Sequence, residues 1–82
     1  NIASLYAGLG NIRQAKFWWN KAILELNDGD AALDYAKFLI NRKNKRDYHK
    51  IIELLKFAIK SDYITEISKE EAGQLLKNLE ST

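Results

Sequence analysis

The spacing of apolar and small residues is the feature that most constrains this chain, because they recur every three to four positions in segments separated by short polar stretches. The clearest segment runs from Ile12 to Leu26, with Ala15, Trp19, Ala22 and Ile23 at these positions. A period of about 3.6 residues places them on one face of an α-helix. The chain has no proline and only four glycines, so it lacks most of the turn residues of an all-β fold. The sequence therefore predicts an all-α domain.

Polar residues between the apolar segments predict where the helices begin and end. The five helices that we expect cover residues 2–9, 12–26, 31–41, 48–59 and about 67–81. Gly10 ends the first helix. The other four are expected to be capped in order by Asn11, Asp30, Asp47 and Ser68, with Gln14 and Glu71 completing two capping boxes. Residues 42–46 are expected to form a polar loop, and Tyr63–Thr65 is too short to count as a strand.

An internal repeat relates the second and fourth predicted helices. Four pairs of residues occupy matching positions 36 apart, namely Ala15 and Ile51, Trp19 and Leu55, Ala22 and Ala58, and Ile23 and Ile59. A repeat of this length is typical of stacked helix pairs, in which each pair buries its apolar face against the next. Small residues let two helices approach closely, and large residues fill the space beside them.

The first 23 residues, NIASLYAGLGNIRQAKFWWNKAI, resemble a tetratricopeptide repeat. The resemblance is carried by Ala3, Tyr6, Gly10, Asn11, Ala15, Trp19 and Ala22. The second unit opens with Gly29-Asp30-Ala31 and has a longer inter-helix loop, Arg42–Asp47, so it is similar to the related Sel-like repeats. Ser68–Ser81 resembles the first helix of a third unit, with Gly73 at the small position and Leu76 at the aromatic one.

This resemblance implies one domain over residues 1–82. Its fold would be an α–α superhelix of two helix-turn-helix repeats, about residues 1–29 and 30–62, closed by a capping helix at about residues 67–81. The last helix is polar on one side, as expected of a cap. The first helix would leave Ile2, Leu5 and Leu9 partly bare. We therefore expect the chain to be the C-terminal part of a longer repeat protein, or to associate with itself through its first helix.

Catalytic and metal-binding motifs are missing from the sequence. There is no cysteine and only one histidine, His49, and no nucleophile motif accompanies it. Gly8-Leu9-Gly10 opens like a dinucleotide-binding loop, but Arg13 stands where the third glycine belongs. Asp28 and Asp30 lack the further carboxylates of a calcium-binding loop. We expect a protein that is not an enzyme and that binds no cofactor and no metal.

The resemblance also implies a concave groove lined by the first helix of each unit, in which side chains one turn from the packing residues point inward. Carried onto this sequence, the groove residues are Asn1, Ser4 and Gly8 in the first unit, Asp34, Lys37 and Asn41 in the second, and Gln74, Lys77 and Asn78 in the last helix. Asn1 matches an asparagine that helps to hold a peptide carboxylate in some tetratricopeptide proteins. Lys37 and Lys77 would add charge-assisted hydrogen bonds.

A second candidate surface follows from the repeat comparison. Phe17 and Leu24 stand where the fourth helix carries Glu53 and Lys60. Because they are seven positions apart, they lie on one helix face, and with Lys21 they are expected to form an exposed convex patch. Such a patch binds a partner, packs on another part of a longer chain, or consists of scattered exposed hydrophobes without a role.

A third candidate surface is the basic run of Arg42, Lys43, Lys45 and Arg46, which places four positive charges within five residues. This run fits a phosphate, an RNA or an acidic peptide. A solvated loop between two helices is the commoner role of such a run.

Together these surfaces predict a protein-interaction module, a scaffold or adaptor segment that binds a peptide or a partner helix. Two alternatives stay open: a small regulatory or inhibitor protein that blocks a partner's active site, and a nucleic-acid-associated helical module that uses residues 42–46. The net charge of +2 is too small to favour nucleic acid. No apolar run approaches about 20 residues, so we expect no membrane partner. The sequence does not indicate the compartment.

Overall fold

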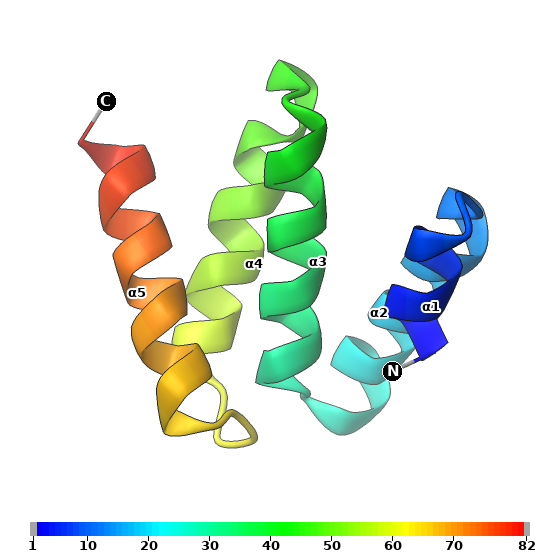
Figure 1. Ribbon diagram of the computed structural model, residues 1–82. Coiled ribbons are helices and arrows are strands. Elements are labelled where there is room, and N and C mark those ends of the chain that lie inside the picture. The colour runs from blue at the N-terminus through cyan, green and yellow to red at the C-terminus, as the bar shows by residue number, and fades with distance from the viewer. Residues whose placement is uncertain (1, 82) are drawn as a thin grey trace.

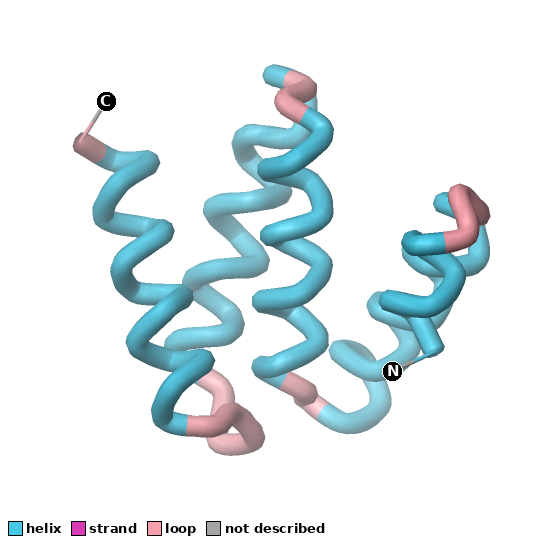
Figure 2. Tube along the Cα trace, in the orientation of Figure 1, coloured by secondary structure: helices cyan, strands magenta, loops and turns pink. Residues whose placement is uncertain are grey.

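The computed structural model describes residues 2–81, which fold into five α-helices and one short 3₁₀ helix. The elements are α1 (Ile2–Gly8), α2 (Ile12–Leu26), α3 (Gly29–Arg42), η1 (Lys45–Asp47), α4 (Tyr48–Lys60) and α5 (Glu66–Glu80). No strand occurs among the described residues, and Figure 2 shows helix along nearly the whole trace. The all-α prediction is confirmed.

The helices lie in two layers that alternate along the chain. In Figure 1, α1, α3 and α5 form the nearer layer, and α2 and α4 lie behind them. Each helix packs against the next one in the chain, and α3 also contacts α5. Successive elements that are joined by short turns therefore stack side by side, as the amphipathic pattern of each segment requires.

The turns at the two ends of α2 follow the sequence pattern. Asn11 accepts a hydrogen bond from the Gln14 backbone N–H at 3.3 Å, so it caps α2 as predicted. Gly10 has a φ of 81°, a left-handed conformation that glycine adopts without steric cost, and it closes the turn after α1. At the other end of α2, Asn27 adopts a left-handed conformation with a φ of 51°.

Two predicted caps are wrong in the middle of the chain. Asp28, not Asp30, caps α3, because its extended backbone lets the carboxylate accept from the Ala31 N–H at 3.1 Å. Asp30 instead accepts hydrogen bonds from the backbone N–H and the hydroxyl of Thr65, at 3.3 and 3.2 Å. Asp47 makes no side-chain cap, because its backbone is already helical as the last residue of η1.

The basic run and the start of α5 also differ from the prediction. Residues 42–46 are not a simple loop: Arg42 ends α3, Lys43 is left-handed with a φ of 55°, and Lys45 opens η1. The extended Asn44 caps η1 by accepting from the Arg46 N–H at 3.0 Å. Helix α5 begins at Glu66 and not at Ser68, because Thr65 provides the cap.

The core lies mainly between α3 and α4. The buried apolar residues are Ala3, Ala15, Trp19, Ala31, Ala32, Leu33, Tyr35, Ala36, Leu39, Ile51, Leu54, Leu55, Ala58 and Ala72. Alanine spacing lets α3 approach its neighbours, and leucines fill the layer between them. The two repeat positions Ala22 and Ala58 are not equivalent, because Ala58 is fully buried and Ala22 is half-buried.

The segment between α4 and α5 is fastened to the start of α3. Ser61 donates from its hydroxyl to the Asn27 carbonyl at 2.6 Å, and the Gly29 N–H donates to the Tyr63 carbonyl at 3.0 Å. Asp28 and Tyr63 form an isolated parallel bridge. Residues 34 or more positions apart are thus joined at one end of the helix stack.

Candidate binding surfaces

The predicted groove residues are spread over α1, α3 and α5. Lys37 on α3 forms an ion pair with Glu71 on α5, with Nζ and Oε2 3.0 Å apart. Gln74 donates to the Asn78 side chain at 3.0 Å along α5. Lys37 and Gln74 therefore already have intramolecular partners. A peptide carboxylate that binds Lys37 would have to displace Glu71. A partly exposed pair of this kind contributes about 0.5 kcal/mol, so displacement costs little.

The other groove positions are less closely grouped. Ser4, Asn41, Lys77 and Asn78 are exposed, Asp34 is half-buried, and Asn1 lies outside the described residues. The structure brings α3 and α5 together through Lys37 and Glu71. Binding of a peptide along these helices remains a prediction.

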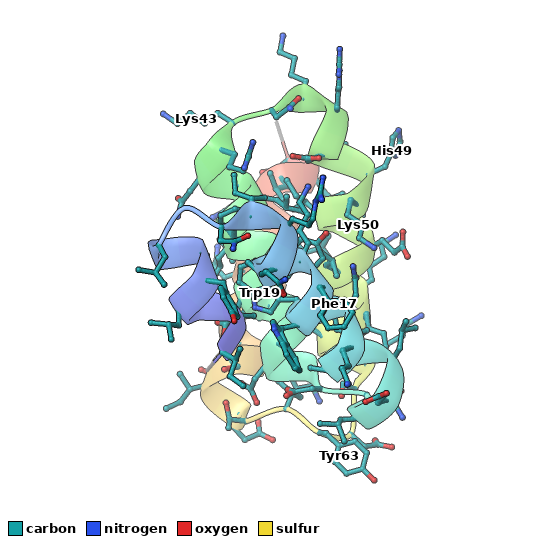
Figure 3. The ribbon with its side chains drawn as sticks, turned by 90° about the vertical axis from the view of Figure 1, so that its right-hand side faces the viewer. Phe17, Trp19, Lys43, His49, Lys50 and Tyr63 are labelled. Carbon is teal, nitrogen blue, oxygen red and sulfur yellow. The ribbon has the colours of Figure 1, made fainter. Side chains whose placement is uncertain are left out.

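The convex patch lies on α2. Phe17 is 54% exposed and Leu24 is 82% exposed. The Lys21 ammonium lies 6.0 Å from the Phe17 ring centre and 5.3 Å from that of Trp18. Phe17 and Trp18 meet edge to face at 5.3 Å. Figure 3 shows Phe17 on the face of α2 that is turned towards the viewer.

The basic residues gather where α3 ends and α4 begins. Arg42, Lys43, Lys45 and Arg46 are all exposed. The Arg42 guanidinium lies 5.6 Å from the Phe38 ring centre, a distance at which a cation–π contact forms. Figure 3 shows Lys43 at the upper end of the molecule, remote from Phe17. The basic residues and the convex patch are therefore separate surfaces.

Sequence reasoning missed an apolar cavity between the first two helices and α3. It has a volume of about 350 Å³ and is lined by Ile2, Ala3, Trp18, Trp19, Ala22, Asp28 and Ala31. Among the described residues, the indole Nε1 atoms of Trp18 and Trp19 are buried and have no hydrogen-bond partner. The sequence feature that could have indicated this cavity is the pair of adjacent tryptophans, Trp18 and Trp19. Neighbouring residues of a helix point in different directions, so one helix face cannot bury both rings in the same way.

The part of the chain that the structure describes holds no cluster of metal-binding side chains. No group of three or more His, Asp or Glu side chains lies close enough to hold a metal ion among residues 2–81. His49 is exposed, and its ring meets the edge of Tyr48 at 6.0 Å. None of the described helices combines the length and apolar character needed to cross a bilayer.

No family model, no curated protein and no solved structure matches this chain. Over the described residues the structure defines an all-helical fold, on which the convex patch and the basic residues are exposed. The tetratricopeptide and Sel-like resemblance rests on the residues quoted above and remains a prediction.

Proposed function

We propose that this protein is a protein-interaction module, built as a tetratricopeptide- or Sel-like helical repeat, that binds a partner helix or peptide and has no catalytic activity. The repeat spacing and the alternating two-layer order of the helices support the repeat assignment. The proposed docking surface is the hairpin of α1 and α2, called here the N-terminal hairpin.

The observation that carries this proposal is the concentration of exposed apolar side chains on the N-terminal hairpin and its ends. Among the described residues, nine large hydrophobic side chains are exposed, and six belong to this region: Ile2, Leu5, Leu9, Phe17, Leu24 and Leu26. Scattered single residues are ordinary on a surface, but a group of this kind on two adjacent helices is typical of an interaction site.

The apolar cavity beside the hairpin supports the same surface. Its volume lies within the range of about 300–1,000 Å³ that is usual for ligand sites. Trp18 and Trp19 line this cavity, and each carries an indole N–H donor to which a partner can supply an acceptor. A partner helix that ends at the cavity would bring apolar side chains and free terminal carbonyls together.

Site-specific photo-crosslinking in the source cells tests the proposal. Benzoylphenylalanine replaces Phe17 or Leu24 in one pair of proteins, and Glu53 or Lys60 at the matching positions of α4 in the control pair. We expect a discrete crosslinked partner from positions 17 and 24 and none from 53 and 60. Absence of a crosslink, or equal products from both pairs, would contradict docking at the hairpin.

A further inference from the structure

A second concave surface lies at the opposite end of the helix stack from the turn at residues 27–30. It is a hollow of about 220 Å³ where α3 and α5 end and α4 begins, at the upper end of the molecule in Figure 1. Its lining residues are Leu39, Ile40, Lys43, Asn44, Lys45, Tyr48, Ile51 and Leu79. We call it the terminal hollow.

The terminal hollow combines an aliphatic floor with a cationic rim. Leu39 and Ile51 are buried, and Ile40 and Leu79 are half-buried, so the floor offers hydrocarbon surface. Lys43 and Lys45 line the hollow and are exposed, and Arg42 and Arg46 adjoin them in the chain. An occupant therefore meets apolar surface below and positive charge at the edge.

Among the described residues, the rim lysines Lys43 and Lys45 form no ion pair. The ion pair that forms in the described part of the chain, between Lys37 and Glu71, involves none of the rim residues. Asp47, which follows Arg46, brings one negative charge to the same segment. Burial, and to a smaller extent Asp47, raises the pKa of the Tyr35 phenol. Four cations within five residues repel one another, and an anion placed among them lowers that repulsion.

The backbone that carries the cations is held in place by local hydrogen bonds. The Lys43 N–H donates to the Ile40 carbonyl at 3.1 Å, and the Asp47 N–H donates to the Asn44 carbonyl at 3.0 Å. The Asn44 side chain accepts from the Arg46 N–H at 3.0 Å. On the α5 side, the Tyr48 hydroxyl donates to the Leu79 carbonyl at 3.5 Å. A rim that is ordered before binding loses less entropy when it binds.

We infer that the terminal hollow binds a short acidic peptide segment in which a large apolar side chain is flanked by Asp or Glu. The apolar side chain enters the hollow, and the carboxylates meet Lys43, Lys45 and Arg46. Charge complementarity carries this choice of partner. The inference rests on the proposed function in that the occupant is a protein segment, but it uses a different surface from the N-terminal hairpin.

The size and chemistry of the hollow favour a peptide over other anions. At about 220 Å³ it is smaller than the sites of about 300–1,000 Å³ that enclose most small ligands, and it suits a single side chain. Proteins that bind single-stranded nucleic acid commonly stack successive bases on several aromatic rings. Tyr48 supplies one ring at the terminal hollow, and the rest of the floor is aliphatic.

Selection of random linear peptides on the immobilised full chain tests the inference. We expect enrichment of sequences with an aliphatic or aromatic residue between acidic residues. A fluorescein-labelled consensus peptide is then measured by fluorescence anisotropy. Replacing its apolar residue by serine should weaken binding about tenfold or more, since burying such a side chain contributes about 1.5–3 kcal/mol.

Matched charge-reversal variants test the location. Lys45→Glu/Arg46→Glu should weaken the consensus peptide about tenfold, because two attractions become repulsions. Lys56→Glu/Lys69→Glu changes the net charge equally at exposed positions of α4 and α5 and should change binding by about twofold at most. Circular dichroism checks that both variants keep the helical fold. Equal loss in both variants, or enrichment without an acidic and apolar pattern, would overturn the inference.

Two further measurements separate the remaining outcomes. If oligouridylate RNA binds more tightly than the consensus peptide and is lost with Lys45→Glu/Arg46→Glu, the surface is a nucleic-acid site and the inference is wrong. Phe17→Glu/Leu24→Lys should leave the consensus peptide bound as in the parent. If this variant abolishes binding and Lys45→Glu/Arg46→Glu does not, the terminal hollow is excluded while docking at the hairpin stands.

Discussion

The N-terminal hairpin and the bundle of α3, α4 and α5 bury their apolar residues to very different degrees. Of the 14 buried apolar residues in the described chain, the hairpin contributes Ala3, Ala15 and Trp19, and the bundle contributes the other eleven. Most of the exposed large hydrophobic side chains lie on or beside the hairpin. The bundle therefore holds most of the hydrophobic stabilisation, and the hairpin holds most of the surface available to a partner.

One side chain provides the main connection between these regions. Trp19 stacks on the Tyr35 ring at 5.1 Å with an interplanar angle of 9°, and it meets the Phe38 ring at 5.2 Å. Because a region with few buried contacts opens at a lower free energy than the core, the hairpin is expected to open locally while the bundle stays folded. A docking surface and a stable core can thus coexist in a small domain by occupying different helices.

The largest expected effect compares two leucines, one from each region. Leu55 is fully buried in α4, and Leu24 is 82% exposed on α2. Leu55→Ala should lower the free energy of unfolding by about 3 kcal/mol, because it removes buried methyl groups and leaves a cavity. Leu24→Ala should change it by no more than about 0.5 kcal/mol. Urea unfolding followed by circular dichroism measures both, and similar values would refute the division into a stable bundle and a weakly buried hairpin.

Trp19→Leu tests the connection itself, since leucine occupies the matching position 55 of α4. The change removes the stacked ring and leaves a smaller apolar side chain, at an expected cost of about 2 kcal/mol. Native-state hydrogen exchange should show faster exchange of α2 amides and little change in α3 and α4.

If Trp19→Leu instead speeds hydrogen exchange equally in all five helices, the hairpin and the bundle open as one unit. Phe17→Leu serves as the control, because Phe17 is exposed on the same helix and does not contact α3 through a ring stack.

The division between helix and turn was predictable because it depends on local patterns. The 3.6-residue period placed the helices near their observed bounds, and Asn11 was identified as a cap from its spacing to Gln14. The all-α class followed from the same pattern and from the absence of proline.

The wrong caps show where local information ends. Asp28 and Asp30 are both good capping residues by type, and the choice between them depends on Thr65, which lies in a distant segment and takes both oxygens of Asp30. Asp47 is not a cap because it is itself the last residue of the 3₁₀ helix η1, which Asn44 caps from within the same segment. A tertiary contact thus decided between Asp28 and Asp30, which sequence propensity ranks as equal, whereas a local turn decided the role of Asp47.

The candidate surfaces were predictable to a smaller extent. The charged run and the positions of Phe17 and Leu24 follow directly from the sequence. The apolar cavity and the terminal hollow arise where three helices meet, and no single segment encodes such a meeting point. The floor of the terminal hollow requires Leu79 from α5 beside Ile40 from α3, residues that are related only through the fold.

Substitution of two glycines, Gly29 and Gly73, has a smaller expected effect and tests the packing at the start of α3. A Cβ at Gly29 would lie 2.7 Å from the Ile64 Cβ and 2.9 Å from the Ser61 Cβ, whereas a Cβ at Gly73 would meet nothing within 4 Å. Gly29→Ala should therefore lower the free energy of unfolding by about 1–2 kcal/mol, because the added methyl group overpacks this contact. Gly73→Ala, in the middle of α5, should stabilise by about 0.5–1 kcal/mol through helix propensity.

Thermal unfolding of the two variants should show a lower melting temperature for Gly29→Ala and a higher one for Gly73→Ala. Stabilisation by both changes would show that the segment at residues 61–64 yields to a methyl group, and that the start of α3 is not tightly packed against it.

The smallest expected effect concerns Tyr35, the bundle residue that Trp19 covers. Burial, with a smaller contribution from Asp47, raises the pKa of Tyr35 above its ordinary value of about 10. The unfolded chain releases this proton near pH 10 while the folded chain retains it, so the folded state binds more protons there. The stability linked to the neutral phenol is therefore complete below about pH 10 and is lost as the pH rises through the raised pKa.

Comparing the parent with Tyr35→Phe isolates this contribution, because the other titrating groups are the same in both proteins. The parent should lose stability more steeply than Tyr35→Phe above about pH 10. In a Trp19→Leu background the difference between the two slopes should shrink, since loss of the stacked indole admits water to the phenol and reduces the burial that shifts its pKa. If the slopes of parent and Tyr35→Phe coincide, the phenol is not desolvated in the folded state. If they differ but Trp19→Leu leaves that difference unchanged, the burial of Tyr35 comes from the bundle alone, and the hairpin adds nothing to it.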